Sequence, residues 1–328
     1  MLSNSIISLL TQDTLWPDQS IMLTGSGELL HANSSVPDYY IIGWSGKPEA
    51  AEQLWQALYR SGELLYIYPS LQLLGQRIWM FGSSLSHDEL SQRLTQVRQQ
   101  FDVVVTDHIP NLNQPGMLVM DMDSTTIQVE CIDEIAKLAG VGEQVSHVTL
   151  RAMRGELDFK QSLRHRVALL KDAPESILAD VAGSLPLMPG LTILLSHLQL
   201  NGWKVVLASG GFTYFAHTLQ RLLGFDAVFA NQLELKEGYL TGQVEGKIVD
   251  ATYKVNVLKT LRDQWNIPQN QTIAIGDGAN DLPMLAESSL GVALHAKPIV
   301  QEKAKIAITH SDLEGLFFVL SAALSARR

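Results

Sequence analysis

The chain has 328 residues, with 34 acidic against 24 basic side chains and a formal net charge of -10 at pH 7. This length allows two domains with a large core, and the acidic balance argues against a nucleic-acid-binding protein, because no basic stripe is present to neutralise phosphates. No apolar run reaches membrane-spanning length, no signal-peptide pattern is present, and the single cysteine, Cys131, cannot form an internal disulfide. We therefore expect a cytoplasmic protein with no nucleic-acid or membrane partner.

Residues 1–110 alternate short apolar strands with amphipathic helices. The pattern predicts strands at 39–44 and 102–106, two strands within 64–81 broken near Gly75, and helices at 48–60 and 86–100. This order, βαββαβ, is typical of a ferredoxin-like α+β domain, an arrangement that ACT-type regulatory domains share. Such an ACT-like domain could sense an amino acid or pair two chains as a homodimer. It could equally be a structural appendage, because a fold does not by itself give a function.

Residues 107–116, rich in proline and asparagine, have the composition of a linker. They lead into an apolar strand that ends in two carboxylates, in the sequence Gly116-Met-Leu-Val-Met-Asp-Met-Asp-Ser-Thr125. Residues i and i+2 of an extended chain project to the same side, so we expect Asp121 and Asp123 to face one pocket at the carboxyl end of the strand, where open α/β sheets bind ligands. Two adjacent carboxylates repel each other unless a cation or a proton intervenes, which suits Mg²⁺. For these residues alone, a polar strand end followed by a turn remains the alternative.

Three further signals follow along the chain. The run from Trp203 to Phe212 is a buried-type strand, and its Ser209, Gly210 and Gly211 precede a helix whose free N–H groups could hold a phosphate. Lys254 begins a predicted helix and supplies a cation. A second β-branched strand ends in Gly276-Asp-Gly-Ala-Asn-Asp281, where the glycines permit a tight turn and Asp277, Asn280 and Asp281 come to the mouth of the strand. Each signal alone is compatible with an ordinary loop or a solvated lysine.

Together, the four segments resemble the ordered motifs of the haloacid dehalogenase superfamily, and most closely those of the phosphoserine phosphatase family. Asp121-Met-Asp-Ser-Thr125 matches the first motif, Ser209 the second, Lys254 the third and Gly276 to Asp281 the fourth. An ordered set of four motifs is far more specific than any one of them. The resemblance spans residues 116–320 and implies an α/β fold, a Rossmann-like core with a parallel sheet and a helical cap insertion, in a domain of residues 111–328.

The resemblance also implies a mechanism and a set of ligands. Asp121 would attack phosphorus and become phosphorylated, while Asp123 would act first as an acid and then as a base. The side chains of Asp121 and Asp277 and the main-chain carbonyl of Asp123 would hold Mg²⁺, with Asp281 supporting the metal shell. Phosphate oxygens would bind to Ser209, Gly210, Lys254 and Asn280.

Substrate choice is expected in the cap, at about residues 127–185. By the resemblance, Glu130 would bind the ammonium group of an amino acid and Arg166 its carboxylate, a pairing that suits the planar guanidinium. Phe159 and Met153 would shield the closed pocket from water. Without the resemblance, Glu130 is an ordinary helix-start acid, Arg166 an exposed charge and Phe159 a core residue.

The resulting hypothesis is a Mg²⁺-dependent phosphoric monoester hydrolase that converts O-phospho-L-serine to L-serine and phosphate, the last step of serine biosynthesis. One alternative is a phosphatase or phosphotransferase of the same superfamily that acts on another small phosphorylated metabolite. Another, of a different class, is an amino-acid-sensing or partner-binding protein with vestigial catalysis. The complete set of motif residues favours the enzyme.

Overall fold

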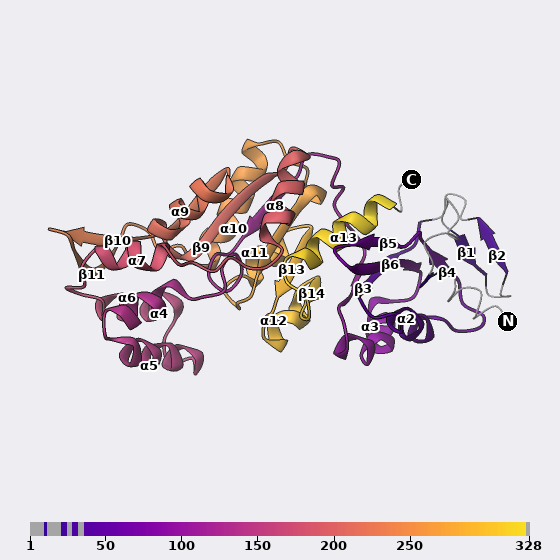
Figure 1. The fold of residues 1–328 in the computed structure, drawn as a ribbon, viewed down its shortest axis with the longest axis horizontal. Coiled ribbons are helices and arrows are strands. Elements are labelled where there is room, and N and C mark those ends of the chain that lie inside the picture. The colour runs from indigo at the N-terminus through magenta and orange to yellow at the C-terminus, as the bar shows by residue number, and fades with distance from the viewer. Residues whose placement is uncertain (1–9, 12–20, 25–27, 32–35, 326–328) are drawn as a thin grey trace. The chain divides into compact units, whose positions relative to one another are not determined.

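The structure is a computed structural model and describes residues 10–11, 21–24, 28–31 and 36–325 (Figure 1). The chain divides into two compact units, one made of residues 1–114 and 292–328 and the other of residues 115–291. Among the described helices, none combines the length and the apolar character that crossing a membrane requires.

The first unit contains an antiparallel sheet in the order β2-β1-β4-β6-β3-β7, with β5 paired to β6. The order β4-β6-β3-β7, with one helix after β3 and one after β6, is the arrangement of a ferredoxin-like domain, so the predicted fold of this region is confirmed. The elements are β1 (Ile21–Leu23), β2 (Leu29–His31), β3 (Tyr39–Ser45), α2 (Ala50–Leu58), β4 (Leu65–Ile67), β5 (Leu71–Leu73), β6 (Gln76–Ser83), α3 (His87–Leu94), the 3₁₀ turn η1 (Val97–Gln99) and β7 (Val103–Thr106).

Residues 64–81 form three strands instead of the two that the sequence predicts. β5 and β6 pair as a tight hairpin in which Leu73 lies opposite Gln76. The turn between them takes Leu74 and Gly75 through positive φ angles of 51° and 76°. The residues of β5 are at most half-buried, so its short pattern carries little signal of a strand.

Both faces of this sheet are covered. Helices α2 and α3 pack on one face, over a core that includes Ile41, Leu54 and Phe81. The terminal helix α13 (Glu314–Ser325) packs against β3, β5 and β6, and its Phe318 ring lies 5.9 Å from the ring of Trp44. Side chains along a strand alternate between its two faces. Ile41 therefore packs on the face covered by α2 and α3, and Trp44 on the face covered by α13.

The buried carboxylate of Asp102 fixes the turn that precedes α13. It accepts hydrogen bonds from the backbone N–H groups of Thr309, His310 and Ser311 at 2.7, 3.1 and 2.7 Å. The hydroxyl groups of Thr309 and Ser311 donate to it as well, at 3.2 and 2.7 Å. A buried carboxylate with this many donors is well satisfied without a cation.

The second sheet is mostly parallel, in the order β11-β10-β9-β8-β12-β13-β14. Strand β8 lies between β9 and β12, parallel to both, and all four of its residues are buried. A strand buried on both faces reads as a continuous apolar run, which explains the Met-Leu-Val-Met sequence. The elements are β8 (Met117–Met120), α8 (Leu191–Leu200), β9 (Lys204–Phe212), α9 (Thr213–Leu223), β10 (Ala227–Lys236), β11 (Tyr239–Glu245), α10 (Ala251–Gln264), the 3₁₀ turn η2 (Gln269–Gln271), β12 (Thr272–Gly276), α11 (Leu282–Glu287), β13 (Leu290–Leu294), α12 (Pro298–Lys303) and β14 (Ile306–Ile308).

A helical insertion separates β8 from α8, as predicted for the cap. It consists of α4 (Cys131–Leu138), α5 (Gly142–Met153), α6 (Phe159–Ala168) and α7 (Ser176–Ala182). Helix α6 begins with a capping box, in which Asp158 and Gln161 satisfy each other's backbone N–H groups. The fold class expected from the sequence, a parallel α/β core with a helical cap and an α+β front region, is thus confirmed.

Candidate active site

The catalytic candidates lie where parallel strands end. Met120, the last residue of β8, lies beside Ile275 of β12 and Leu207 of β9, so the segments after all three strands leave the sheet at one edge. The backbone N–H of Asp121 still donates to the carbonyl of Ile275 at 3.0 Å, which holds the start of the first motif against β12. The strand-end prediction from the sequence is therefore confirmed.

A cavity of about 220 Å³ opens at this edge. It collects nine of the residues that the sequence singles out, and these are Asp121, Asp123, Glu130, Phe159, Arg166, Ser209, Gly210, Asp277 and Asn280. It also contains Gly211, which the sequence places beside Ser209 and Gly210, and three lining residues that were not predicted, Ile132, Leu163 and Phe212. Leu163 follows Phe159 by four positions and precedes Arg166 by three, so helical periodicity along α6 was the signal that could have found it.

Asp121 is held by backbone and side-chain contacts in the turn that follows β8. Its Oδ1 accepts a hydrogen bond from the N–H of Met122 at 2.8 Å. The hydroxyl of Thr126 donates to its carbonyl oxygen at 2.6 Å. Asp121 itself is 6% exposed, which leaves the carboxylate reachable only through the cavity.

Lys254 lies behind the cavity and joins two carboxylates. Its Nζ is 2.8 Å from Oδ1 of Asp121 and 2.7 Å from Oδ1 of Asp281, and Lys254 and Asp281 are both buried. Burial alone lowers the pKa of Lys254, but the two carboxylates outweigh it, so the pKa lies above its usual value. Helix α10 begins at Ala251, three residues before the predicted start, because Asp250 caps it by accepting the N–H of Tyr253 at 2.8 Å.

Three carboxylates form a group that could hold a metal ion. One oxygen from each of Asp121, Asp277 and Asp281 lies within 4.8 Å of the others. Burial, followed by the neighbouring carboxylates, raises the pKa of Asp277 to about 7. Burial and Asp121 raise that of Asp281 to about 6, against the opposing effect of Lys254. Lys254 contacts two of these three carboxylates, which leaves an excess of negative charge in the group, and an all-oxygen donor set fits a hard divalent cation.

Asp123 lines the same cavity but has a different environment. Enclosure by the protein, then the charges of Glu130 and Asp121, raises the pKa of Asp123 to about 8. The backbone N–H of Cys131 donates to its Oδ1 at 3.1 Å. Asp123 therefore carries a proton at neutral pH, as an acid catalyst must. Cys131 is buried, which raises the pKa of its thiol and makes it a poor nucleophile.

The cap supplies the outer wall of the cavity. The hydroxyl of Ser124 donates to Glu130 at 2.9 Å, and Ser124 takes a positive φ of 55°. The Nε of Arg166 is buried with no hydrogen-bond partner among the described residues, and burial lowers the pKa of its guanidinium. A buried donor without a partner is suited to bind a ligand. Met153, expected to shield the pocket, is 64% exposed at the end of α5 and does not line the cavity.

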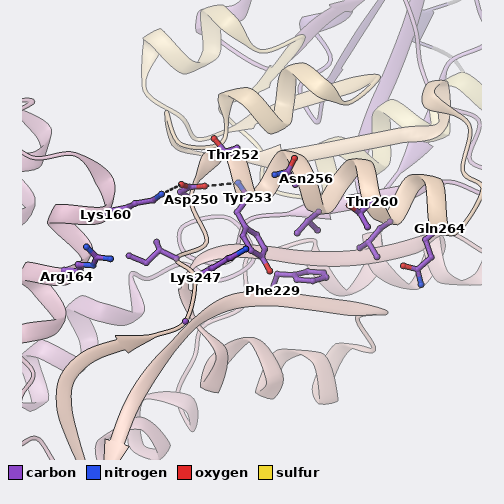
Figure 2. A pocket seen from close by; sticks show the side chains of 14 residues that line it. Lys160, Arg164, Phe229, Lys247, Asp250, Thr252, Tyr253, Asn256, Thr260 and Gln264 are labelled. Carbon is purple, nitrogen blue, oxygen red and sulfur yellow. Dashed lines mark hydrogen bonds and ion pairs between the residues drawn. The ribbon is translucent and has the colours of Figure 1, made fainter.

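A larger groove of about 930 Å³ lies between α6 and α10 and contains none of the motif residues (Figure 2). Lys160 of the cap reaches into it and places Nζ 2.8 Å from Oδ2 of Asp250. Asp250 thus both caps α10 and contacts the cap helix. Size alone would point to this groove, but the reactive carboxylates lie in the smaller cavity, which we therefore take as the active site.

The raised carboxyl pKa values predict how stability depends on pH. Asp123, Asp277 and Asp281 have folded pKa values of about 8, 7 and 6, above the ordinary 3.8. At pH values between 3.8 and about 8, the folded protein therefore binds more protons than the unfolded chain. Without metal, stability should therefore fall as pH rises from about 4 to 8. Metal competes with these protons, so added Mg²⁺ should raise the melting temperature more at pH 8 than at pH 6.

Thermal unfolding in EDTA and in Mg²⁺ at several pH values measures this dependence. Asp277→Asn is the matched variant, because it removes one titrating carboxyl with little change in volume. It should flatten the decline with pH and weaken the response to Mg²⁺. A melting temperature in EDTA that rises from pH 6 to 8 would contradict the assignment of these pKa values.

Comparisons with known proteins show which family the chain resembles. Residues 118–286 match the family model of haloacid dehalogenase-like hydrolases. A phosphoserine phosphatase of Vibrio cholerae is 54% identical over 229 residues, which cover 70% of each chain. The crystal structure of a probable phosphoserine phosphatase from Vibrio cholerae, in an unliganded form, superposes with a TM-score of 0.79 at 42% identity and covers 98% of this chain and 94% of that one.

A third relative concerns the reaction itself. The solved structure of a phospho-aspartyl intermediate analogue of phosphoserine phosphatase superposes with a TM-score of 0.59 at 39% identity, and covers 62% of this chain and 98% of that chain. The match to the family model spans more than half of the chain, and the similarity to the Vibrio relative extends over most of both sequences. The chain belongs to the haloacid dehalogenase-like hydrolases and, within them, to the phosphoserine phosphatases.

Proposed function

We propose that this chain hydrolyses O-phospho-L-serine to L-serine and phosphate through a phosphorylated Asp121, as the last step of serine biosynthesis. It is a phosphoric monoester hydrolase. The observation that carries the proposal is that Asp121, Asp123, Ser209 and Arg166 all line one cavity. One cavity thus contains both the carboxyl groups for the reaction and the guanidinium for binding an amino acid.

The two carboxyl groups of the first motif divide the reaction. Asp121 attacks phosphorus opposite the serine oxygen, and the bond between phosphorus and that oxygen breaks as the aspartyl-phosphate forms. Asp123, protonated at neutral pH because of its raised pKa, gives its proton to the departing serine oxygen. The resulting carboxylate then takes a proton from the water that attacks the phosphoryl group, which releases phosphate and restores both side chains.

Mg²⁺ is the metal we propose for the carboxylate group. Its ligands would be the side chains of Asp121 and Asp277 and the main-chain carbonyl of Asp123, with Asp281 supporting the shell. When bound, the ion neutralises charge on the transferring phosphoryl group. Donors from Ser209, the Gly210 amide, Lys254 and Asn280 hold the phosphate oxygens. Lys254 also stays charged throughout, because two carboxylates face it.

The cap recognises the amino-acid end of the substrate. Arg166 binds the substrate carboxylate, and its buried Nε, which lacks a partner among the described residues, is the donor available for this contact. Glu130 binds the substrate ammonium, which replaces the Ser124 hydroxyl as its hydrogen-bond donor. Phe159 closes the cavity over Gly210 at the end of β9, and Met153 would join it when the cap closes further.

Arg166→Ala tests the substrate assignment. Its kcat/KM for phosphoserine should fall by about 100-fold or more, because a charge-assisted bidentate contact contributes roughly 1.5–3 kcal/mol and its loss leaves a buried carboxylate unpaired. Its rates on phosphoethanolamine and p-nitrophenyl phosphate, which lack the carboxylate, should stay close to those of the wild type. Phosphate release measures kcat/KM for phosphoserine and the rates on the other two substrates.

Arg164→Ala is the matched control, since Arg164 lies on the same helix and is exposed. It should leave the preference for phosphoserine unchanged. An Arg166→Ala protein that loses activity equally on all three substrates would reject the carboxylate contact and favour another small phosphorylated metabolite as substrate. A wild-type protein without phosphatase activity would shift attention to the front region as a binding module.

The proposed division of labour is an ACT-like regulatory or dimerisation domain in residues 1–110 and the phosphatase in residues 111–328, with its cap at about 127–185. We further propose a cytoplasmic location, phosphoserine as the small-molecule partner and assembly as a homodimer. Support for the front domain comes from its ferredoxin-like strand order. Sedimentation with and without L-serine measures both the assembly and its response to an amino acid.

A further inference from the structure

The end of β9, which bears Ser209, contains two glycines for a steric reason. A Cβ atom on Gly210 would lie 2.7 Å from Cζ of Phe159, and one on Gly211 would lie 2.4 Å from Oδ2 of Asp123. Any other residue at either position would therefore push the cap or the acid catalyst out of place. The consequence is a Gly-Gly peptide unit with little conformational restraint of its own, although it borders the site where phosphate must bind.

A buried amide supplies the missing restraint. Asn231 lies on β10, is 1% exposed, and follows a shift in the pairing of β10 with β9. Its Nδ2 donates to the carbonyl of Gly210 at 2.7 Å, and its Oδ1 accepts the backbone N–H of Val249 at 2.8 Å. The carbonyl of Gly210 and the N–H of Gly211 belong to one peptide unit, so the first contact fixes both.

The fixed peptide in turn orients Ser209. The N–H of Gly211 donates to Oγ of Ser209 at 2.9 Å. Because the hydroxyl oxygen of Ser209 accepts this bond from Gly211, the hydroxyl hydrogen of Ser209 can be donated to a ligand in the cavity. A flipped peptide would instead present a carbonyl to Ser209, which would draw the hydroxyl hydrogen away from the ligand.

The second contact of Asn231 reaches the helix that carries Lys254. Val249 directly precedes Asp250, which caps α10 and contacts Lys160 of the cap (Figure 2). We propose that Asn231 is a positioning residue that holds the end of β9 and the start of α10 in place relative to each other, so that Ser209 and Lys254 bind the same phosphate group. The inference rests on the proposed function, since it presumes that this phosphate is the substrate's.

Asn231→Asp tests the proposal, because aspartate keeps the shape and the acceptor for Val249 but loses the donor when ionised. At pH 8, kcat/KM for phosphoserine should fall at least about tenfold, since a misplaced contact can cost up to ~100-fold, and the inhibition constant of inorganic phosphate should rise with it. Burial at this position, which is 1% exposed in the wild type, raises the pKa of the introduced carboxyl, so a larger fraction is protonated at pH 6 and can donate to Gly210 again. The ratio of variant to wild-type activity should therefore rise as the pH falls.

Asn201→Asp is the matched control, because the Asn201 amide also donates to a backbone carbonyl, that of His197 at 2.8 Å, but outside the cavity. This control should change neither kcat/KM for phosphoserine nor the inhibition constant of inorganic phosphate. A variant at Asn231 that loses stability but keeps wild-type values for phosphoserine KM and phosphate inhibition, or a ratio that does not change with pH, would overturn the proposal. If Asn231→Asp does not fold, Asn231→Ser, which lacks the amide donor to Gly210, carries the measurements of kcat/KM and phosphate inhibition without the pH comparison. Failure of the wild type to hydrolyse phosphoserine would instead reject the proposed function.

Discussion

Asp121→Asn should reduce phosphoserine turnover by about 10⁴-fold or more, because it removes the nucleophile and leaves the amide unable to form the phosphorylated intermediate. The fold should persist. Asn has nearly the volume of Asp, the N–H of Met122 can still donate to the amide oxygen, and Lys254 keeps its contact with Asp281. Removing one of three clustered carboxylates also relieves repulsion, so the melting temperature in EDTA should not fall.

Steady-state phosphate release and thermal unfolding of the same preparation separate these two effects. Asp263→Asn provides the control, because Asp263 is exposed and contacts only Arg262 among the ion pairs of the described residues. It should match the wild type in both measurements. If Asp121→Asn retained substantial turnover, covalent catalysis through this side chain would be rejected; if it unfolded, the loss of activity would carry no information on mechanism.

Lys254→Met should lower both stability and activity. Methionine fills similar space but leaves the carboxylates of Asp121 and Asp281 without the ammonium that lies 2.8 and 2.7 Å away. Removing one partner of a buried ion pair costs roughly 3–5 kcal/mol, because the remaining charge is left uncompensated. The carboxylates can escape this cost by taking up protons, so the loss of stability should be smaller at pH 5 than at pH 8.

Denaturant unfolding at the two pH values measures the difference, and phosphate release measures the accompanying loss of kcat. Lys259→Met is the matched control on the same helix, where Lys259 contacts Glu287 at the surface. It should cost at most about 1 kcal/mol, as exposed ion pairs do. Equal destabilisation by the two substitutions, or a loss that grows at low pH, would contradict the role of Lys254 as the counter-ion of the buried carboxylates.

The sequence could locate the chemistry because the relevant signals are local. Asp121 and Asp277 each follow a short buried strand, and parallel strands bring such ends to one edge regardless of what lies between them. The ferredoxin-like order of the front region was predictable for the same reason, since each strand and helix has its own periodicity. Placement of the cap over the site came from the resemblance of its sequence to a known family.

Other features depend on contacts between distant residues and left no local pattern. Asn231 looks like any polar strand residue until β10 brings it beside Gly210. Nothing in the apolar sequence of α13 indicates that it covers the sheet of the front region, where Phe318 meets Trp44. Met153 ends α5 and is exposed, and the sequence pattern alone did not indicate that it lies outside the cavity.

Chemical identification of the phosphorylated residue during turnover tests the central claim most directly. Wild-type protein mixed with labelled phosphoserine and Mg²⁺, then quenched in acid and digested, should carry label on the peptide that contains Asp121, and phosphoethanolamine should give far less. EDTA and Asp121→Asn should each abolish the label. Phosphate release from phosphoserine without any phosphorylated enzyme, or with label on another residue, would contradict the account.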